Sequence, residues 1–243
     1  MARRVDRLLL AWACTLAVVA PAGADTVTLG ASKDNTIYEN TALSNGAGQH
    51  LFAGRTTTTP PANQRVRRSL IAFDVGSIPA GATVQSATLT LHMSKTISGP
   101  TNIAAHRLLA DWGEGTSVAG RGEGAGAAAT TNDATWSFRF FNTASWSTPG
   151  GQFNATASAT TSVNQAGDYS WTGSGLVADV QDWVNGTANF GWILRGNEVS
   201  ILTTKRFDSR QVVTASFRPR LVVVFMPLPV EATTWSQVKA LFR

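Results

Sequence analysis

The sequence contains a single cysteine, Cys14, among its 243 residues. This cysteine falls within the apolar start of the chain, so the rest of the protein has no thiol with which to form a disulfide. The fold must therefore be held together by the burial of apolar side chains alone. The chain is long enough for this, because a single domain of about 200 residues removes roughly 70% of its unfolded surface from water.

Recognisable catalytic motifs are also missing. The sequence has no HExxH run, no P-loop and no Gly-x-Ser-x-Gly elbow. Asp111 and Glu114, together with Asp133, offer an acid and a base for glycoside hydrolysis, but such carboxylates are ordinary in a polar loop. A lyase would need a histidine beside a tyrosine, and the candidates are His50, His92, His106, Tyr38 and Tyr169. We predict a protein that is not an enzyme, with glycan cleavage as an alternative.

Charged residues are scarce, at 14% of the chain, with 20 Lys and Arg against 15 Asp and Glu. The excess of five positive charges falls to three without the first 24 residues. The basic residues are nevertheless clustered, at Arg65, Arg67 and Arg68, at Lys205, Arg206 and Arg210, and at Arg218 and Arg220. Such clusters predict either a patch that attracts an acidic polymer or charged strand edges that resist pairing with other chains.

Residues 1–24 have the pattern of a signal peptide. Three arginines precede an apolar run from Leu8 to Ala20, which is shorter than the ~20 residues of a transmembrane helix. Ala22-Gly23-Ala24 has the small residues of a cleavage site. The pattern predicts a protein that is secreted or held at the cell surface, without a transmembrane segment. An uncleaved signal anchor is the alternative.

Strand patterns dominate the remainder of the chain. From Val84 to Met93, apolar and polar residues alternate, which is typical of a strand with one wet face. Residues 70–73 and 221–225 are apolar throughout, which predicts strands covered on both faces. Further strands are expected at 26–29, 36–38, 50–53, 102–109, 134–138, 169–171, 190–195 and 203–207. This spacing predicts an all-β fold, with an antiparallel β-sandwich as the architecture.

Two short helices are expected beside the strands. Within the domain, Leu176 to Val184 carries an apolar stripe at helical spacing, with Asp179 and Asp182 facing away from it. Residues 227–243 form a tail, in which two prolines precede an amphipathic helix at 233–243. The tail's apolar side would pack on the domain itself or on a partner at the cell surface. We expect one domain over 25–226, with a long glycine-rich loop between 112 and 135 that is either functional or mobile.

The order of several short motifs resembles the DNRLRE family, exported β-sandwich modules that include carbohydrate-binding modules and the repeats of a microbial disaggregatase. The matching pieces are Asp34-Asn-Thr-Ile-Tyr38, Asn45-Gly46, 51–55, 68–91, Asp111-Trp-Gly-Glu-Gly115, Asp133-Ala-Thr-Trp136, 146–151, 180–185, Asn189-Phe-Gly191, Phe207-Asp-Ser-Arg210 and 218–221. The resemblance implies a jelly-roll sandwich. The chain departs from the family at Gln211, where members usually have a glutamate.

The resemblance implies a non-catalytic module that binds a polysaccharide. An anionic glycan would meet a basic groove formed by Arg55, Arg67, Arg68, Lys205, Arg206 and Arg210. Trp112 and Trp146 stand beside glycine-rich loops, where they either stack on sugar rings or fill the core. A structural or adhesive surface protein is the alternative function. Nucleic acid is not expected as a partner, because the chain is exported and lacks a reading motif.

No cofactor is expected, although sandwiches of this kind often carry a structural calcium ion. Asp34, Asn35 and Glu39 offer oxygen ligands near the start of the domain. Their spacing matches no metal loop, so ordinary turn contacts explain them equally well.

Overall fold

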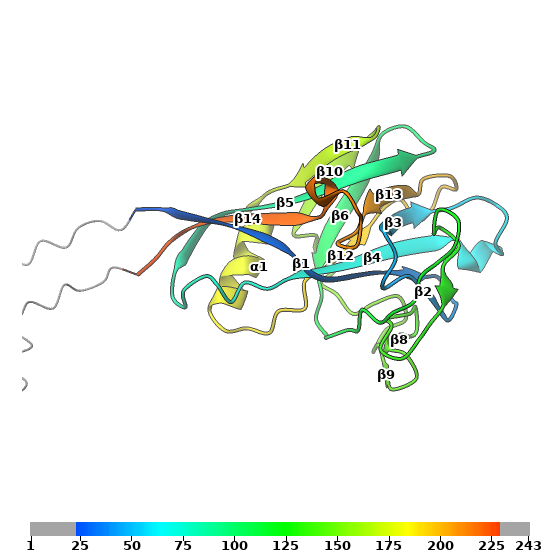
Figure 1. Ribbon diagram of the computed structural model, residues 1–243, viewed down its shortest axis with the longest axis horizontal. Coiled ribbons are helices and arrows are strands. Elements are labelled where there is room, and N and C mark those ends of the chain that lie inside the picture. The colour runs from blue at the N-terminus through cyan, green and yellow to red at the C-terminus, as the bar shows by residue number, and fades with distance from the viewer. Residues whose placement is uncertain (1–22, 229–243) are drawn as a thin grey trace, which may run out of the picture.

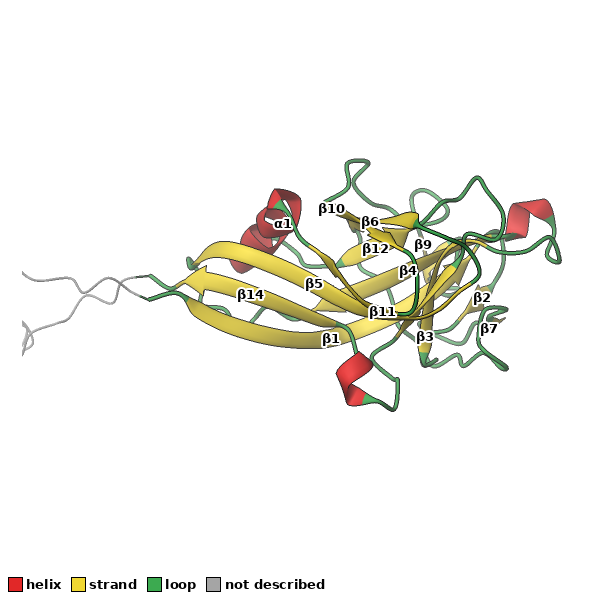
Figure 2. Ribbon diagram, turned by 90° about the horizontal axis from the view of Figure 1, so that it is seen from above, coloured by secondary structure: helices red, strands yellow, loops and turns green. Residues whose placement is uncertain are grey.

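The computed structural model describes residues 23–228, which form a mostly β structure with antiparallel strands and one α-helix (Figures 1 and 2). The predicted signal peptide and the predicted C-terminal helix both lie outside these residues, except for Gly23 and Ala24. The strands are β1 (Asp25–Tyr38), β2 (Leu43–Ser44), β3 (His50–Arg55), β4 (Val66–Phe73), β5 (Thr83–Thr96), β6 (Thr101–Arg107), β7 (Ala127–Ala128), β8 (Phe138–Phe140), β9 (Ala144–Ser145), β10 (Ala159–Val163), β11 (Gly167–Trp171), β12 (Trp192–Arg195), β13 (Lys205–Asp208) and β14 (Arg220–Met226). The helix α1 spans Ser174–Val184.

Six strands pair around a closed ring, in the order β1, β14, β5, β13, β3, β4 and back to β1. The long strand β1 makes this closure possible, because residues 25–30 pair with β14 whereas residues 31–38 pair with β4. From β4 the sheet continues through β12 and β6 to β10, and β11 joins the free edge of β5. The all-β antiparallel prediction is confirmed. Ten strands form one continuous sheet that includes the closed ring, and β2 with β7 and β8 with β9 form two further two-stranded sheets.

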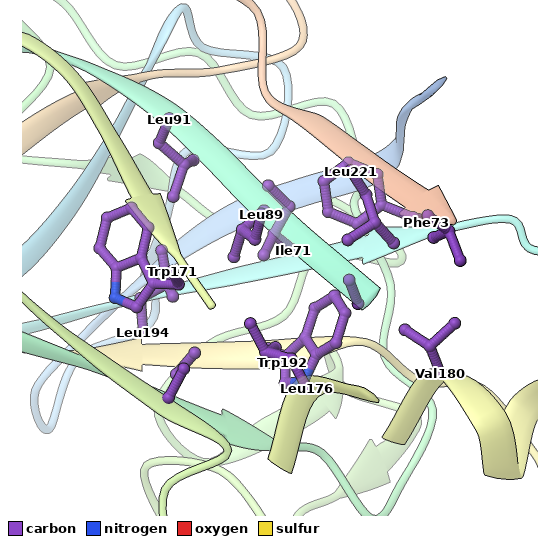
Figure 3. Packing of buried hydrophobic residues seen from close by; sticks show 14 of the residues in the cluster. Ile71, Phe73, Leu89, Leu91, Trp171, Leu176, Val180, Trp192, Leu194 and Leu221 are labelled. Atoms are coloured by element: carbon purple, nitrogen blue, oxygen red, sulfur yellow. The ribbon is translucent and has the colours of Figure 1, made fainter. Parts of the chain in front are cut away.

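The main core fills the inside of this curved sheet, and α1 covers one end of it (Figure 3). Leu89, Leu91 and Met93 are fully buried, as the alternation along β5 predicts. Leu176 and Val180 of α1 pack against the same core. The prediction for Asp179 was wrong, because its carboxylate is buried, where it accepts hydrogen bonds from Trp192 Nε1 at 2.8 Å and Ser158 Oγ at 2.5 Å.

A second core lies on the other side of β4, beneath the long loops between β6 and β10. Leu70 and Ala72 face this second core, whereas Ile71 and Phe73 face the main one. Strand β4 is therefore covered on both faces, which confirms the prediction made from its continuous apolar run. The two cores together bury all of these side chains to 4% exposure or less.

Three strand predictions need correction. The separate strands expected at 26–29 and 36–38 are parts of one strand, β1. In β14 the residues alternate between fully and partly buried, so this strand is not covered completely on both faces. Residues 134–137 belong to a loop, because Ala134 and Trp136 are buried in the second core without a strand partner. Strand β10 was not predicted, since its sequence, Ala-Thr-Thr-Ser-Val, has little apolar alternation.

The two ends of the described chain lie at one pole of the molecule. Asp25 pairs with Phe225, so β1 begins where β14 ends (Figure 1). The end of β3 and its neighbouring loops lie at the opposite pole. Among residues 23–228, no helix combines the length and the apolar composition that crossing a bilayer requires.

Candidate ligand-binding site

Three neighbouring strands place two cations and an aromatic ring in one row on the outside of the sheet. Arg206 of β13 lies opposite Lys95 of β5 on one side and opposite Phe52 of β3 on the other. Directly opposed residues of antiparallel strands point to the same face. Lys95 is exposed and Arg206 is half-buried, so this face is open to solvent. These three side chains form one wall of a cleft, and the pairing register of the strands fixes their positions.

Arg67 adds a third cation to the same face. It lies opposite Gly54 of β3 and opposite Tyr38 of β1, and its guanidinium sits 4.6 Å above the Tyr38 ring. Its Nη1 donates to the carbonyls of Gln64 at 2.8 Å and Val66 at 3.0 Å. Burial lowers the pKa of Arg67 from its ordinary value. An arginine held this firmly offers a fixed positive charge at the bottom of the cleft.

The glycine-rich loop forms the opposite wall and supplies a fourth cation, Arg121. Together with the strands it encloses a cavity of about 280 Å³. The lining residues are Phe52, Thr56, Arg67, Lys95, Thr96, Ile97, Arg121, Gly122, Gly124, Ala125, Thr204 and Arg206. We call this cavity the basic cleft.

The lining of the basic cleft contains four cations and no carboxylate. Arg206 donates from Nε to Ser94 Oγ at 3.1 Å, which leaves its terminal nitrogens for other partners. Within residues 23–228, neither Lys95 nor Arg121 makes a side-chain hydrogen bond or an ion pair. Unneutralised cations on the walls of a cleft concentrate the positive potential there. The chemistry of the cleft therefore favours an anionic ligand.

Lys205 does not belong to this site, contrary to the prediction. It is fully buried and donates from Nζ to Thr96 Oγ1 at 2.7 Å, Ser98 O at 3.0 Å and Gly99 O at 2.7 Å. Burial lowers the pKa of Lys205. Successive residues of a strand point to opposite faces, so Lys205 and Arg206 cannot both face a ligand on the same side.

Three of the predicted basic residues bind groups of the protein itself, namely Arg55, Arg68 and Arg210. Arg68 makes a two-pronged ion pair with Glu198, at 2.7 and 2.9 Å, and Arg210 pairs with Glu114 at 2.9 Å. The guanidinium of Arg55 donates to the Glu198 carbonyl at 3.0 Å and to a neighbouring loop carbonyl at 2.7 Å. Of the six basic residues predicted, the structure brings only Arg67 and Arg206 together in the basic cleft.

Trp112 and Trp146 are core residues rather than exposed platforms. Their side chains are 1% and 4% exposed and belong to the second core. Each indole N–H is satisfied inside the protein, Trp112 Nε1 by Phe190 O and Trp146 Nε1 by Thr135 O, both at 2.9 Å. A ring without an exposed face cannot stack on a sugar, so the core interpretation is the one that the structure supports.

Sequence reasoning missed Lys95 and Arg121. The alternation along β5 places Lys95 on the same face as the buried Met93, two residues before it, but one extra residue is inserted at a bulge opposite Arg206 and Phe207. That bulge reverses the face of Lys95, which no pattern of residues shows. Arg121 stands in an irregular loop, where periodicity carries no information about neighbours.

The three residues proposed as calcium ligands accept hydrogen bonds from separate parts of the chain. Asp34 Oδ2 accepts from the Arg210 N–H at 2.7 Å, and Glu39 Oε2 accepts from the N–H groups of Arg65 and Val66. Asn35 Oδ1 accepts from three donors within its own neighbourhood. Burial raises the pKa of Asp34 to about 8. Within the described residues, no cluster of three or more His, Cys, Asp or Glu side chains is arranged to hold a metal ion.

The carboxylates considered for hydrolysis are held by partners of their own. Asp111 pairs with Lys33 at 2.5 Å, Glu114 pairs with Arg210, and Asp133 is buried while it accepts from Thr130.

The histidines considered for a lyase come together only in part. Asp208 Oδ2 lies 2.6 Å from His92 Nδ1, and Asp208 Oδ1 lies 3.6 Å from His50 Nε2. His92 also stacks on Phe217, with ring centroids 3.8 Å apart. The Tyr38 hydroxyl instead donates to the carbonyl of Glu123, so it is not directed at this histidine pair.

No family model matches the chain, and no curated protein matches it either.

Proposed function

We propose that the protein is an exported, non-catalytic module of the jelly-roll type that binds an anionic polysaccharide in the basic cleft. The observation that carries the proposal is the set of four cations that line this cleft without a carboxylate among them. Guanidinium groups suit carboxylates and sulfates, because their planar forks donate two parallel hydrogen bonds. The resemblance to the DNRLRE family points to the same class of ligand.

The apolar part of the cleft suits a sugar ring. The half-exposed side chain of Ile97 supplies the open apolar surface, whereas Phe52 is 5% exposed and lies behind the lining. Sugar rings present apolar C–H faces as well as polar edges, so an apolar surface ringed by cations fits an acidic sugar. A volume of about 280 Å³ admits a short stretch of a polymer rather than a long one.

The position of the cleft also suits presentation at a surface. Both ends of the described chain leave the domain at the pole opposite to β3 (Figure 1). The basic cleft is lined by Phe52 of β3 and Arg206 of β13, away from the pole where Asp25 pairs with Phe225. The proposed partner is a polysaccharide of a cell surface or an extracellular matrix.

Binding of the full chain to polygalacturonate, dextran sulfate and uncharged dextran tests the proposal. We expect binding to one or both anionic polymers, no binding to dextran, and affinity that falls as salt rises. The double variant K95Q/R206Q should lose at least about tenfold in affinity, equivalent to about 1.4 kcal/mol. A reducing-end assay on each bound polymer checks that nothing is cleaved.

The matched control is R220Q. Arg220 is a partly exposed arginine of β14 that pairs with Asp168 at 3.2 Å and does not line the cleft. Its substitution removes one positive charge, as R206Q alone does, without touching the site, so affinity should stay within about twofold of the original, which is about 0.4 kcal/mol. Equal losses in R220Q and in R206Q, or binding that does not change with salt, would overturn the proposal.

A further inference from the structure

The wall of the basic cleft that carries Arg121 has an unusual backbone. Arg121, Gly122 and Glu123 have φ angles of 38°, 72° and 67°, so three successive residues lie in the left-handed region. Residues other than glycine avoid this region, at a cost of about 1–2 kcal/mol each. Such a conformation persists only where the surroundings enforce it. The contacts of this segment therefore show what holds it in place.

The side chain of Glu123 makes most of the contacts that hold this segment in place. It is 8% exposed, and its carboxylate accepts hydrogen bonds from the backbone N–H groups of Gln49 at 3.1 Å and His50 at 2.8 Å. The amide of Asn45 donates to the same carboxylate at 2.9 Å. The His50 ring nitrogen Nδ1 lies 3.3 Å away. These donors precede and begin β3, so Glu123 fastens the loop to a strand of the cleft.

The backbone of the same segment accepts hydrogen bonds from side chains of β1 and β4. The Glu123 carbonyl accepts from the Tyr38 hydroxyl at 3.0 Å, and the Gly124 carbonyl accepts from Arg67 Nε at 3.2 Å. The loop therefore contacts β1, β3 and β4 within four residues. Arg121, two residues before Glu123, has no such contact of its own within residues 23–228.

We infer that Glu123 is a positioning residue, which holds the loop so that Arg121 faces an anion in the basic cleft; this inference rests on the proposed function. Glu123 is not among the residues that line the cleft. The two possible effects of Glu123 on affinity, through its charge and through its position, have opposite signs. Coulomb repulsion alone predicts that removing a carboxylate near a bound anion strengthens binding. Positioning predicts that removing it weakens binding, because the loop leaves its strained conformation and Arg121 moves with it.

The test compares the affinity of five variants for the anionic polymer that the full chain binds, dextran sulfate or polygalacturonate. We expect E123Q and R121Q each to weaken binding about five- to tenfold, which is about 1 to 1.4 kcal/mol. The double variant R121Q/E123Q should be no weaker than R121Q alone, because both changes remove the same contact. The slope of log affinity against log salt should fall by about one in each of the three variants.

The variant E123D tests whether the position of the carboxylate matters when its charge is kept. Aspartate keeps the charge but withdraws the carboxylate by one methylene, so we expect it to weaken binding as E123Q does. The matched control is E39Q, because Glu39 also accepts two backbone N–H groups but holds none of the loop. Its affinity should be equal to or higher than that of the unmodified protein. Melting curves of all five variants confirm that binding is measured on folded protein.

Two outcomes would overturn the inference while the proposed function stands. One is that E123Q binds as well as or better than the unmodified protein while K95Q/R206Q binds worse. The other is that E123D binds normally, since the reach of the carboxylate to the Gln49 and His50 N–H groups would then not matter for binding. If instead K95Q/R206Q binds as well as the unmodified protein, the proposed function fails first, and the inference fails with it.

Discussion

Lys205 and Arg206 are consecutive residues of β13, yet their side chains lie on opposite sides of the sheet. The Lys205 ammonium is buried and bound by Thr96, Ser98 and Gly99, whereas Arg206 lines the basic cleft. One of these cations stabilises the turn after β5, and the other is free to meet a ligand. Two adjacent positive charges thus have different functions, and their substitutions should have different effects.

Replacing Lys205 with methionine should destabilise the protein by about 1–3 kcal/mol. Methionine fills the space but donates no hydrogen bond, so the carbonyls of Ser98 and Gly99 lose their buried partner. Urea unfolding measures this loss. The matched change R206Q should alter the unfolding free energy by less than about 0.5 kcal/mol, as is usual for surface positions. Equal stability losses in the two variants would contradict the assignment of opposite faces.

Replacing Trp112 with alanine should cost about 3–5 kcal/mol of stability, because it empties a buried volume and leaves the Phe190 carbonyl without its donor. Trp146 should behave in the same way. At a temperature where the variants remain folded, their affinity for the anionic polymer should be unchanged. A selective loss of binding with unchanged melting temperature would show instead that these rings meet the ligand.

Asp34→Asn should stabilise the protein more at pH 8 than at pH 4. Burial raises the pKa of Asp34 from 3.8 to about 8, so between these values the unfolded chain loses a proton that the folded protein keeps. The native protein therefore becomes less stable as pH rises through this window. Asparagine has no such proton. The difference in unfolding free energy between variant and native protein should grow by at least about 1.4 kcal/mol from pH 4 to pH 8, the equivalent of one pKa unit.

The contribution of Glu123 should have the opposite pH dependence. Burial by itself raises the pKa of Glu123, but hydrogen bonds from His50, Asn45 and Gln49 outweigh it and lower the pKa to about 2. Its stabilising effect is complete above 4.5, the ordinary value, and is lost as pH falls through about 2. The stability difference between native protein and E123Q, from urea unfolding, should shrink steadily from pH 5 to pH 3. A difference that stays constant over this range would contradict the pKa shift.

The prediction of a calcium site can be tested directly by thermal unfolding. Asp34, Asn35 and Glu39 accept hydrogen bonds from groups of the protein itself, so we expect no stabilisation by calcium at this place. The melting temperature should be the same with excess calcium and with a chelator. A rise of several degrees in calcium would show a metal site that these contacts do not explain.

Local patterns predicted much of the fold because one face of each strand is buried. The alternation from Val84 to Met93 and the apolar run at 70–73 both follow from contact with a core, and both are confirmed. Strand β10 was missed for the same reason, since its short sequence shows little alternation. The split of β1 between two partner strands was also invisible, because a local pattern does not reveal which strand lies alongside.

The candidate site was predicted much less well. Clusters in the sequence suggested that neighbouring basic residues act together, but Arg67 and Arg68 point to opposite faces, as do Lys205 and Arg206. The tryptophans beside glycine-rich loops were compatible with two roles, and only their burial decides between these roles. Arg121 and Glu123 gave no signal, because a loop is placed by contacts with distant strands.

The sequence by itself determined most of the main strands and the helix α1, because the periodic burial of apolar side chains is a local property of the chain. It also determined that no disulfide supports this core. Only the tertiary structure decided which cations face solvent together, since that depends on pairing register, on a bulge in β5 and on the loop that Glu123 fastens to β3. Binding sites are made by residues far apart in the chain, and their meeting is fixed by packing rather than by spacing.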